Sequence, residues 1–438
     1  MNESIAGLPF HLFTFDENGA ATNPTEHAAT VDDISAQSLT DLFIFSHGWN
    51  NDRNTALSLY RRYFGEMVKL LNDPAFPARR AATVGLAGIV WPSILWPDET
   101  PDANVPGGAA SLTSTSLPTE ADILRQLYPQ PEQRALLDPL LTFLNQKERN
   151  VAALTAFRDG IVQLTQPQHG QPPDTLPLDL TKLAQADPRD LFEPLAEFEP
   201  GPHSMGGAAG LGDVFGSLWQ GAKAALRVTT YWTMKERGGV VGQVGLGPLL
   251  GQLHQRQPHL RLHLIGHSFG ARLVSYALKA LTPNGAGGVS PVKQLVLMQG
   301  AFSHFAFARK LPFDPARRGD LADMDERVDG LVATTFSEHD LAVAHAYRLA
   351  SLLAGQDAAA AGDLTFRWQG MGYDGAQAVG AKTMRLGEPG TTYPRGNSRF
   401  INLDSNHVIR NGGLPAGAHG DIVHPHTAWV PLTLAGLR

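Results

Sequence analysis

The sequence predicts an α/β protein with a mostly parallel sheet covered by helices on both faces. Short apolar runs of strand length alternate with segments whose apolar residues recur at helical spacing. The clearest pair is RLHLIGHSFGARLVSY, residues 261–276, where a buried strand passes through one tight turn into a helix. Three polar loops directly follow such strands. We therefore expect these loops to meet at the carboxyl edge of the sheet, where α/β proteins bind ligands.

Most elements can be placed along the chain from their apolar pattern and turn residues. An additional strand within 28–34 is only weakly indicated, and the glycine-rich region 355–395 shows no clear pattern. The expected strands are residues 8–15, 42–45, 83–91, 260–265, 292–298, 328–336 and 399–403, and the expected helical segments are 54–71, 134–166, 214–254, 341–353 and the C-terminal stretch from about 421.

The 438-residue chain exceeds the usual size of a single core, and its composition changes after residue 97. Residues 98–212 are rich in proline and interrupt the strand–helix alternation. We expect residues 1–97 and 213–438 to form the core and residues 98–212 to form an inserted cap or lid. The large apolar residues of this insertion either pack it onto the core, the favoured interpretation, or face an apolar acyl chain: Leu124, Leu127, Leu136, Leu137 and Phe143.

Composition narrows the class of partner. The net charge is −7 and no block of basic residues is present, which argues against nucleic acid. The chain contains no cysteine, so disulfides and thiolate chemistry are excluded. No apolar run is long enough to cross a bilayer, and the N-terminus does not resemble a signal peptide. We expect a cytoplasmic location, with signal-independent export as the alternative, and a small-molecule or lipid ester as substrate; the oligomeric state is not indicated.

A candidate nucleophile lies in the turn after the strand at 260–265. In Gly266-His267-Ser268-Phe269-Gly270, glycines flank the serine two residues away on either side. This spacing allows a strand to turn sharply into a helix with the serine hydroxyl exposed above the sheet. A similar string around Ser204 follows no strand and leads into a glycine-rich loop, which makes it a decoy.

A serine becomes a good nucleophile when a histidine removes its proton and a carboxylate orients that histidine. Asp340 follows the strand at 328–336 and is the preferred acid, with Glu338 as the alternative. His419 lies in a glycine-bordered loop after the last strand and is the preferred base, with His424 and His407 as alternatives. Asp340 could instead only cap the following helix.

The C-terminal histidines could also suggest a zinc site. His419, Asp421, His424 and His426 supply suitable ligand types, but their spacing matches no known zinc motif. We therefore expect no metal and no cofactor.

Acyl transfer also requires amide donors for the developing oxyanion. The amide of Phe269, directly after the serine, is one candidate. The second is the amide of Trp49 in SHGWNND, residues 46–52, which follows an early strand, and Gly48 would allow close approach to the substrate carbonyl. The simpler interpretation is an ordinary loop that caps the next helix.

With these residues in place, the chain resembles the α/β-hydrolase superfamily, in the order Ser268, Asp340, His419. Five strings resemble a group of bacterial α/β-hydrolases of unknown substrate: SHGWNND, VWPS, MKERGGVVG, HLIGHSFGARLVSYAL and FSEHDLAVAHAYRLAS. The resemblance covers residues 8–95 and 214–438. It implies an eight-stranded, mainly parallel sheet and hydrolysis of an ester, thioester or amide without a cofactor.

The sequence therefore predicts a serine hydrolase that cleaves a carboxylic ester through an acyl-enzyme. Two alternatives remain: a hydrolase-fold module that binds without turnover, and a lipase that acts on membrane lipid. Neither the acyl group nor the alcohol of the substrate is indicated by the sequence.

Overall fold

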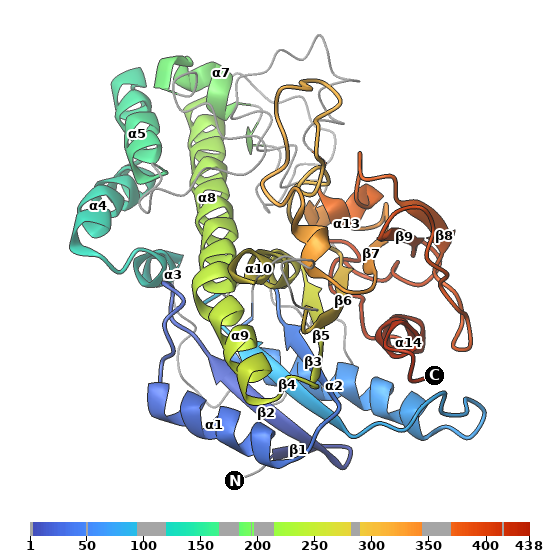
Figure 1. The fold of residues 1–438 in the computed structure, drawn as a ribbon. Coiled ribbons are helices and arrows are strands. Elements are labelled where there is room, and N and C mark those ends of the chain that lie inside the picture. The colour runs from blue at the N-terminus through green and yellow to red at the C-terminus, as the bar shows by residue number, and fades with distance from the viewer. Residues whose placement is uncertain are drawn as a thin grey trace.

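The computed structural model describes most of the chain, and its ribbon is shown in Figure 1. The candidate site residues all lie within the described part, whereas about half of the proline-rich insertion lies outside it. The described residues are 3–49, 51–93, 120–165, 184–193, 195–196, 214–281, 290–343, 369–413 and 416–438.

The described residues form one nine-stranded sheet with the order β1-β2-β4-β3-β5-β6-β7-β9-β8. Only β1 and β2 pair antiparallel; every other neighbouring pair is parallel. The α/β class is therefore confirmed, with one strand more than the resemblance implies. The strands are β1 (Glu3–Ile5), β2 (Leu8–Thr14), β3 (Asp41–Ser46), β4 (Val84–Val90), β5 (Arg261–His267), β6 (Val292–Met298), β7 (Val332–Phe336), β8 (Lys382–Arg385) and β9 (Phe400–Asp404).

Alternate side chains of the central strands point into two hydrophobic layers. In β3, Leu42 and Ile44 belong to one apolar cluster, and Phe43 and Phe45 belong to the other. A strand whose side chains are all buried reads as a continuous apolar run, as β3 does. The first layer is covered by α1 (Pro24–Ala36), α8 (Val214–Val240), α9 (Gly247–Arg256) and α10 (Phe269–Ala277), and the second by α2 (Arg53–Asn72) and α14 (Pro425–Leu434).

The long helix α8 connects the inserted region to the sheet (Figure 1). Its glycines at 238 and 239 do not break it; the helix continues to Val240 and passes into a π-helical segment, Val241–Leu246. Close packing on α10 explains the glycine at 242, because a Cβ there would lie 2.1 Å from the Leu273 carbonyl oxygen. Glycine here serves interhelical contact rather than flexibility.

The described part of the insertion packs along α8. Its helices are α3 (Glu120–Leu127), α4 (Pro131–Gln146), α5 (Val151–Leu164) and α7 (Pro188–Phe192). Leu124, Leu127 and Leu137 are buried in the same apolar cluster as the sheet, and Leu136 and Phe143 pack against it. These five residues thus pack the insertion onto the core.

One expectation from the sequence is wrong. Residues 28–34, weakly predicted as a strand, lie in helix α1. Asn23 caps this helix by accepting a hydrogen bond from the Glu26 amide, and Pro24 occupies its first turn. Val31 and Ile34, three residues apart, supply its buried face.

Other boundaries differ by a few residues. The C-terminal helix begins at Pro425 rather than near 421, with His424 as its N-cap. Part of the glycine-rich region forms β8 and the short helix α13 (Met371–Asp374). The helix expected at 341–353 lies almost wholly outside the described residues. None of the described helices has both the length and the apolar character needed to cross a membrane.

Candidate active site

Ser268 occupies a forced backbone conformation between β5 and α10. Its φ of 57° and ψ of −123° are unusual for a residue with a side chain. Hydrogen bonds hold this turn: the Ser268 amide donates to the Met298 carbonyl at 3.0 Å, and the Ser268 carbonyl accepts from the Ala271 and Ala301 amides. A serine held this way by the surrounding backbone is typical of a functional position.

Three glycines make room for this turn. A Cβ on Gly266 would lie 2.4 Å from the Gly270 carbonyl oxygen, and one on Gly270 would lie 2.1 Å from that of Ser46. A Cβ on Gly48 would lie 2.4 Å from the Ser268 Cβ. The loop after β3 and the turn after β5 therefore touch, as their place at one sheet edge predicts.

The preferred acid and base are in direct contact. His419 Nδ1 lies 3.0 and 2.9 Å from the two carboxylate oxygens of Asp340. Asp340 is completely buried, and the His419 side chain is 15% exposed. Because a carboxylate only accepts, Nδ1 carries the proton, which leaves Nε2 as the proton acceptor. This is the orientation that a general base requires.

The loop that carries His419 is fastened to the loop that carries Asp340. Asp340 and Gly417 form an antiparallel bridge, and the Ala418 amide donates to the His339 carbonyl at 2.8 Å. These backbone contacts explain how segments 79 residues apart in the chain hold a side-chain pair.

His267, beside the candidate nucleophile, also holds the base. Its Nε2 lies 2.8 Å from the His419 carbonyl oxygen, and the two rings are 4.9 Å apart between centroids. Burial, reinforced by the neighbouring His419, lowers the pKa of His267 to about 3, so the ring is neutral at physiological pH. Nε2 therefore donates to the carbonyl. Among the described residues, no hydrogen bond joins Ser268 Oγ directly to His419 Nε2.

The two candidate oxyanion amides belong to the residues that directly follow Gly48 and Ser268, which lie in close contact. Phe269 is the first residue of α10, and its amide therefore has no partner within the helix. Neither this amide nor that of Trp49 donates to another residue in the described part of the chain. The Phe269 amide thus lies at the N-terminus of α10, and the Trp49 amide lies in the loop after β3.

His47 fixes the loop that carries the Trp49 amide. The Trp91 amide donates to His47 Nε2 at 3.3 Å, so Nδ1 carries the proton and donates to the Gly48 carbonyl at 2.9 Å. The Tyr60 hydroxyl accepts from the His47 amide at 2.9 Å. Burial lowers the pKa of His47 to about 4, which keeps this arrangement neutral. We did not predict this role from the sequence, although His47 directly follows a strand.

Aromatic side chains form an apolar wall beside the turn. The Trp49 ring lies 6.0 Å from both the Tyr231 ring and the Phe269 ring, and Tyr231 lies 4.9 Å from Phe269. Tyr231 belongs to α8, so the helix that holds the insertion also borders the candidate site.

A further polar residue at the site was missed in the sequence. Gln299 directly follows β6, and its Nε2 donates to Asp340 Oδ2 at 3.0 Å. Its position after a strand, at the same edge as the three polar loops, was a signal that could have found it.

The alternative residues lie elsewhere. Glu338 is exposed, and its amide donates to Asn406. His424 pairs with Asp421 at 2.8 Å and caps α14. His407 has no contact with Asp340; its ring lies 6.2 Å from that of His426. The decoy Ser204 falls outside the described residues.

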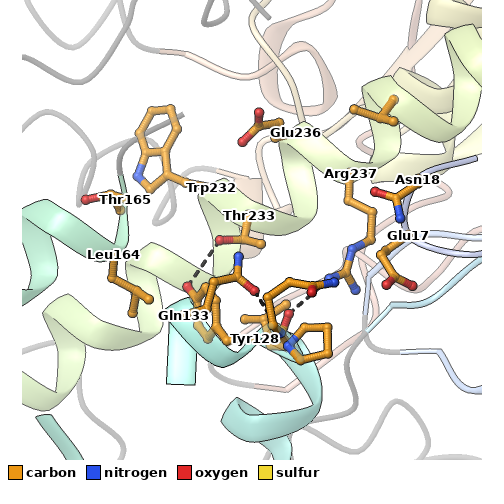
Figure 2. Close-up of a pocket in the computed structure, with 14 residues that line it drawn as sticks. Glu17, Asn18, Tyr128, Gln133, Leu164, Thr165, Trp232, Thr233, Glu236 and Arg237 are labelled. Carbon is orange, nitrogen blue, oxygen red and sulfur yellow. Dashed lines mark hydrogen bonds between the residues drawn. The ribbon is translucent and has the colours of Figure 1, made fainter. Parts of the chain in front are cut away.

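The described residues contain no group of three or more metal-ligating side chains placed to hold an ion. A cavity of about 110 Å³ is lined by residues of α8, among them Trp232, Thr233 and Arg237, and by residues of the insertion such as Tyr128 and Gln133 (Figure 2). Arg237 lines it and donates to the Pro92 and Leu127 carbonyls at 3.0 and 3.1 Å. Burial lowers the pKa of Arg237 to about 10. None of the candidate catalytic residues borders this cavity.

Comparison of the chain with protein-family models, curated proteins and solved structures finds no significant match. The arrangement of Ser268, His419 and Asp340 is therefore the principal basis for an inference about function.

Proposed function

We propose that the protein is a serine hydrolase of the α/β-hydrolase fold that cleaves a carboxylic ester through an acyl-enzyme at Ser268. The observation that carries this proposal is the buried His419–Asp340 pair, held at the sheet edge where Ser268 sits in its strained turn. A buried carboxylate that fixes a histidine tautomer beside a serine is the arrangement of a catalytic triad.

The proposed reaction assigns one step to each group. His419 Nε2 takes the proton from Ser268 Oγ as that oxygen attacks the ester carbonyl carbon. The amides of Trp49 and Phe269 donate to the resulting oxyanion. When the tetrahedral intermediate collapses, the C–O bond to the alcohol breaks, and His419 returns the proton to the leaving oxygen. Water then repeats the sequence, releasing the acid and restoring Ser268.

The geometry at Ser268 and His419 is compatible with this reaction without a direct hydrogen bond between them. Catalytic hydrogen bonds are often long in ligand-free enzymes and shorten when substrate binds. His267 keeps the two residues together, because it adjoins Ser268 in the chain and donates to the His419 carbonyl.

Two further features support the α/β-hydrolase fold. The serine lies on a strand-to-helix turn, and the second amide donor comes from the loop between β3 and the following helix α2. The chain order of serine, aspartate and histidine is also that of this superfamily.

Turnover of a short-chain p-nitrophenyl ester tests the assignment of the base. We expect His419→Ala and Asp340→Asn each to lower kcat/KM by about 100-fold or more, because triad members act as a unit. His424→Ala is the matched control: it removes another histidine paired with an aspartate, and its kcat/KM should stay within about twofold of wild type.

Equal activity of His419→Ala and wild type would reject the assigned base, and loss of activity in His424→Ala alone would transfer the role to His424. Absence of turnover by the wild-type protein on ester, thioester and amide substrates alike would favour a binding module.

A further inference from the structure

We infer that Gln299 is a positioning residue that holds Asp340 in the orientation in which it binds His419. The inference rests on the proposed function and adds a fourth side chain to the assembly. Gln299 lies directly after β6, between the strand that leads to Ser268 and the strand that leads to Asp340. It is completely buried.

Both N–H groups of the Gln299 amide have an acceptor. Nε2 donates to Asp340 Oδ2 at 3.0 Å and to the Gly372 carbonyl at 3.0 Å. A primary amide nitrogen has two protons, so both are engaged. The side chain therefore links the candidate acid to helix α13.

The orientation of the amide is determined by Thr335. The Thr335 hydroxyl donates to Gln299 Oε1 at 3.0 Å and accepts from the Gln299 backbone amide at 3.3 Å. If the amide were flipped, its oxygen would face the Asp340 carboxylate and the Gly372 carbonyl, which are both acceptors. The network allows only the orientation with the donor toward Asp340.

The backbone of Gln299 is also held in an unusual conformation. Its φ is +48°, in the left-handed region that residues with side chains rarely adopt. Gly372 packs directly against it: a Cβ at position 372 would lie 2.6 Å from the Gln299 carbonyl carbon. Strain of this kind persists where surrounding contacts require it.

Neutral donors surround the Asp340 carboxylate. The Val343 amide donates to Oδ1 at 3.1 Å, and Gln299 donates to Oδ2. In the described part of the chain, no lysine or arginine lies within ion-pair distance of Asp340. Two directed hydrogen bonds thus fix the plane of the carboxylate and leave its charge available to the imidazolium that forms at His419 during the reaction.

The test compares two buried glutamines, one within β6 and one directly after it. Gln299→Leu removes the donor to Asp340 with little change in volume. Gln294→Leu is the matched control, because Gln294 is equally buried and its Nε2 also donates to two acceptors, His263 and the Pro431 carbonyl, but at the opposite end of β6. We expect kcat for ester hydrolysis to fall about 10- to 100-fold in Gln299→Leu, with KM within about twofold, and to stay unchanged in folded Gln294→Leu.

Gln299→Glu provides a pH signature that a purely structural role would not produce. While the introduced carboxyl group is protonated, it can still donate to Asp340; once both groups ionise, like charges about 3 Å apart repel each other. Turnover relative to wild type should therefore fall as the pH rises from 5 to 8. A ratio that does not change with pH would overturn the inference, as would wild-type kcat in Gln299→Leu.

A measurement without substrate separates failure of this inference from failure of the proposed function. The His419 Nδ1 proton, shared with Asp340, should give a strongly deshielded NMR signal in the wild-type protein and in Gln294→Leu. We expect this signal to shift or disappear in Gln299→Leu. If it is unchanged there, Gln299 does not position Asp340, whether or not the wild-type protein hydrolyses esters.

Discussion

Gly48 and Ser268 approach so closely that a single methyl group between them would move one or the other. A Cβ on Gly48 would lie 2.4 Å from the Ser268 Cβ, 2.9 Å from the His267 carbonyl oxygen and 3.0 Å from Ser268 Oγ. Two of these three atoms belong to the candidate nucleophile. The glycine therefore determines how near the Trp49 amide can come to the serine hydroxyl.

Gly48→Ala is expected to lower kcat/KM for ester hydrolysis by about 100-fold, because a displacement of about 1 Å at a reacting group has an effect of this size. The steady-state rate on a p-nitrophenyl ester measures it. Gly65→Ala is the control: Gly65 lies within α2, and a Cβ there meets nothing within 4 Å. It should leave activity unchanged and stabilise the fold by about 0.5–1 kcal/mol. Wild-type activity in Gly48→Ala would show that this contact does not control the site.

At this scale the sequence was informative about residues that follow strands. Ser268 was predicted from the glycine spacing of the turn after its strand, and Asp340 and His419 from their places in loops after later strands; the Asp340–His419 contact is observed. Gln299 and the supporting contacts of His47 were missed. Both residues follow strands, but their roles depend on partners from other elements, such as Tyr60 in α2 and Gly372 in α13, which spacing along the chain does not reveal.

Among the elements, the two ends of strand β3 lie in different environments. Its carboxyl end leads into the candidate site, whereas its first residue, Asp41, is buried among basic side chains. Arg80 Nη1 donates to Asp41 Oδ2 at 2.8 Å, and His263 Nε2 lies 2.8 Å from Oδ1. Burial alone would raise the pKa of Asp41, but the hydrogen bonds from His263 and Arg80 outweigh it and hold the pKa well below its usual range.

Asp41→Asn is expected to lower the free energy of unfolding at pH 7 by about 3 kcal/mol, because it removes the buried carboxylate that accepts hydrogen bonds from Arg80 and His263. Urea denaturation measures this difference. Since the pKa of Asp41 is lowered in the folded state, its contribution is complete above about pH 4 and declines as the pH falls further. The difference between variant and wild type should therefore shrink in acid.

Asp138→Asn is the control for this prediction. Asp138 pairs with Arg125 at the surface, where both side chains are about half exposed, and its loss should change stability by less than about 1 kcal/mol. Equal effects of the two substitutions would mean that burial of the Asp41 cluster does not strengthen its interactions.

Elements with a strong apolar period were predictable, and those defined by capping or packing were less so. The strand–turn–helix around Ser268 was predicted because the apolar pattern is clear in both the strand and the helix. Helix α1 was not, because only Val31 and Ile34 of its side chains are buried, and the Asn23-Pro24 start signal was the better guide. The packing role of the glycines in and just after α8 was not predicted, because their contacts with α10 cannot be seen from the sequence.

For the whole molecule, one apolar cluster continues from the sheet through α8 into the insertion. The candidate site lies between this cluster and the layer on the other face of the sheet. Two histidines at this edge, His47 and His267, are buried and neutral. The burial of these two histidines therefore makes the folded state sensitive to acid.

Stability should fall between pH 7 and pH 5. The pKa values of His47 and His267 are lowered to about 4 and about 3 from an ordinary 6.5. Below pH 6.5 the unfolded chain therefore binds protons that the folded chain does not, and stability decreases as the pH falls. Each histidine should contribute a loss of about 2 kcal/mol at pH 5.

Urea unfolding at pH 7 and pH 5 measures this loss, and His47→Gln should reduce the difference between the two values by about 2 kcal/mol. Equal stability of the wild-type protein at both pH values would mean that these histidines are not kept neutral by folding.

The most direct test of the proposed chemistry is reaction with a fluorophosphonate probe, followed by mass spectrometry of the intact chain and its peptides. We expect one label per chain on Ser268, lost in Ser268→Ala and kept in Ser275→Ala, which alters a buried serine on the same helix. A label that persists in Ser268→Ala, or that maps to Ser204 in the wild-type protein, would contradict the assignment of Ser268 as the nucleophile.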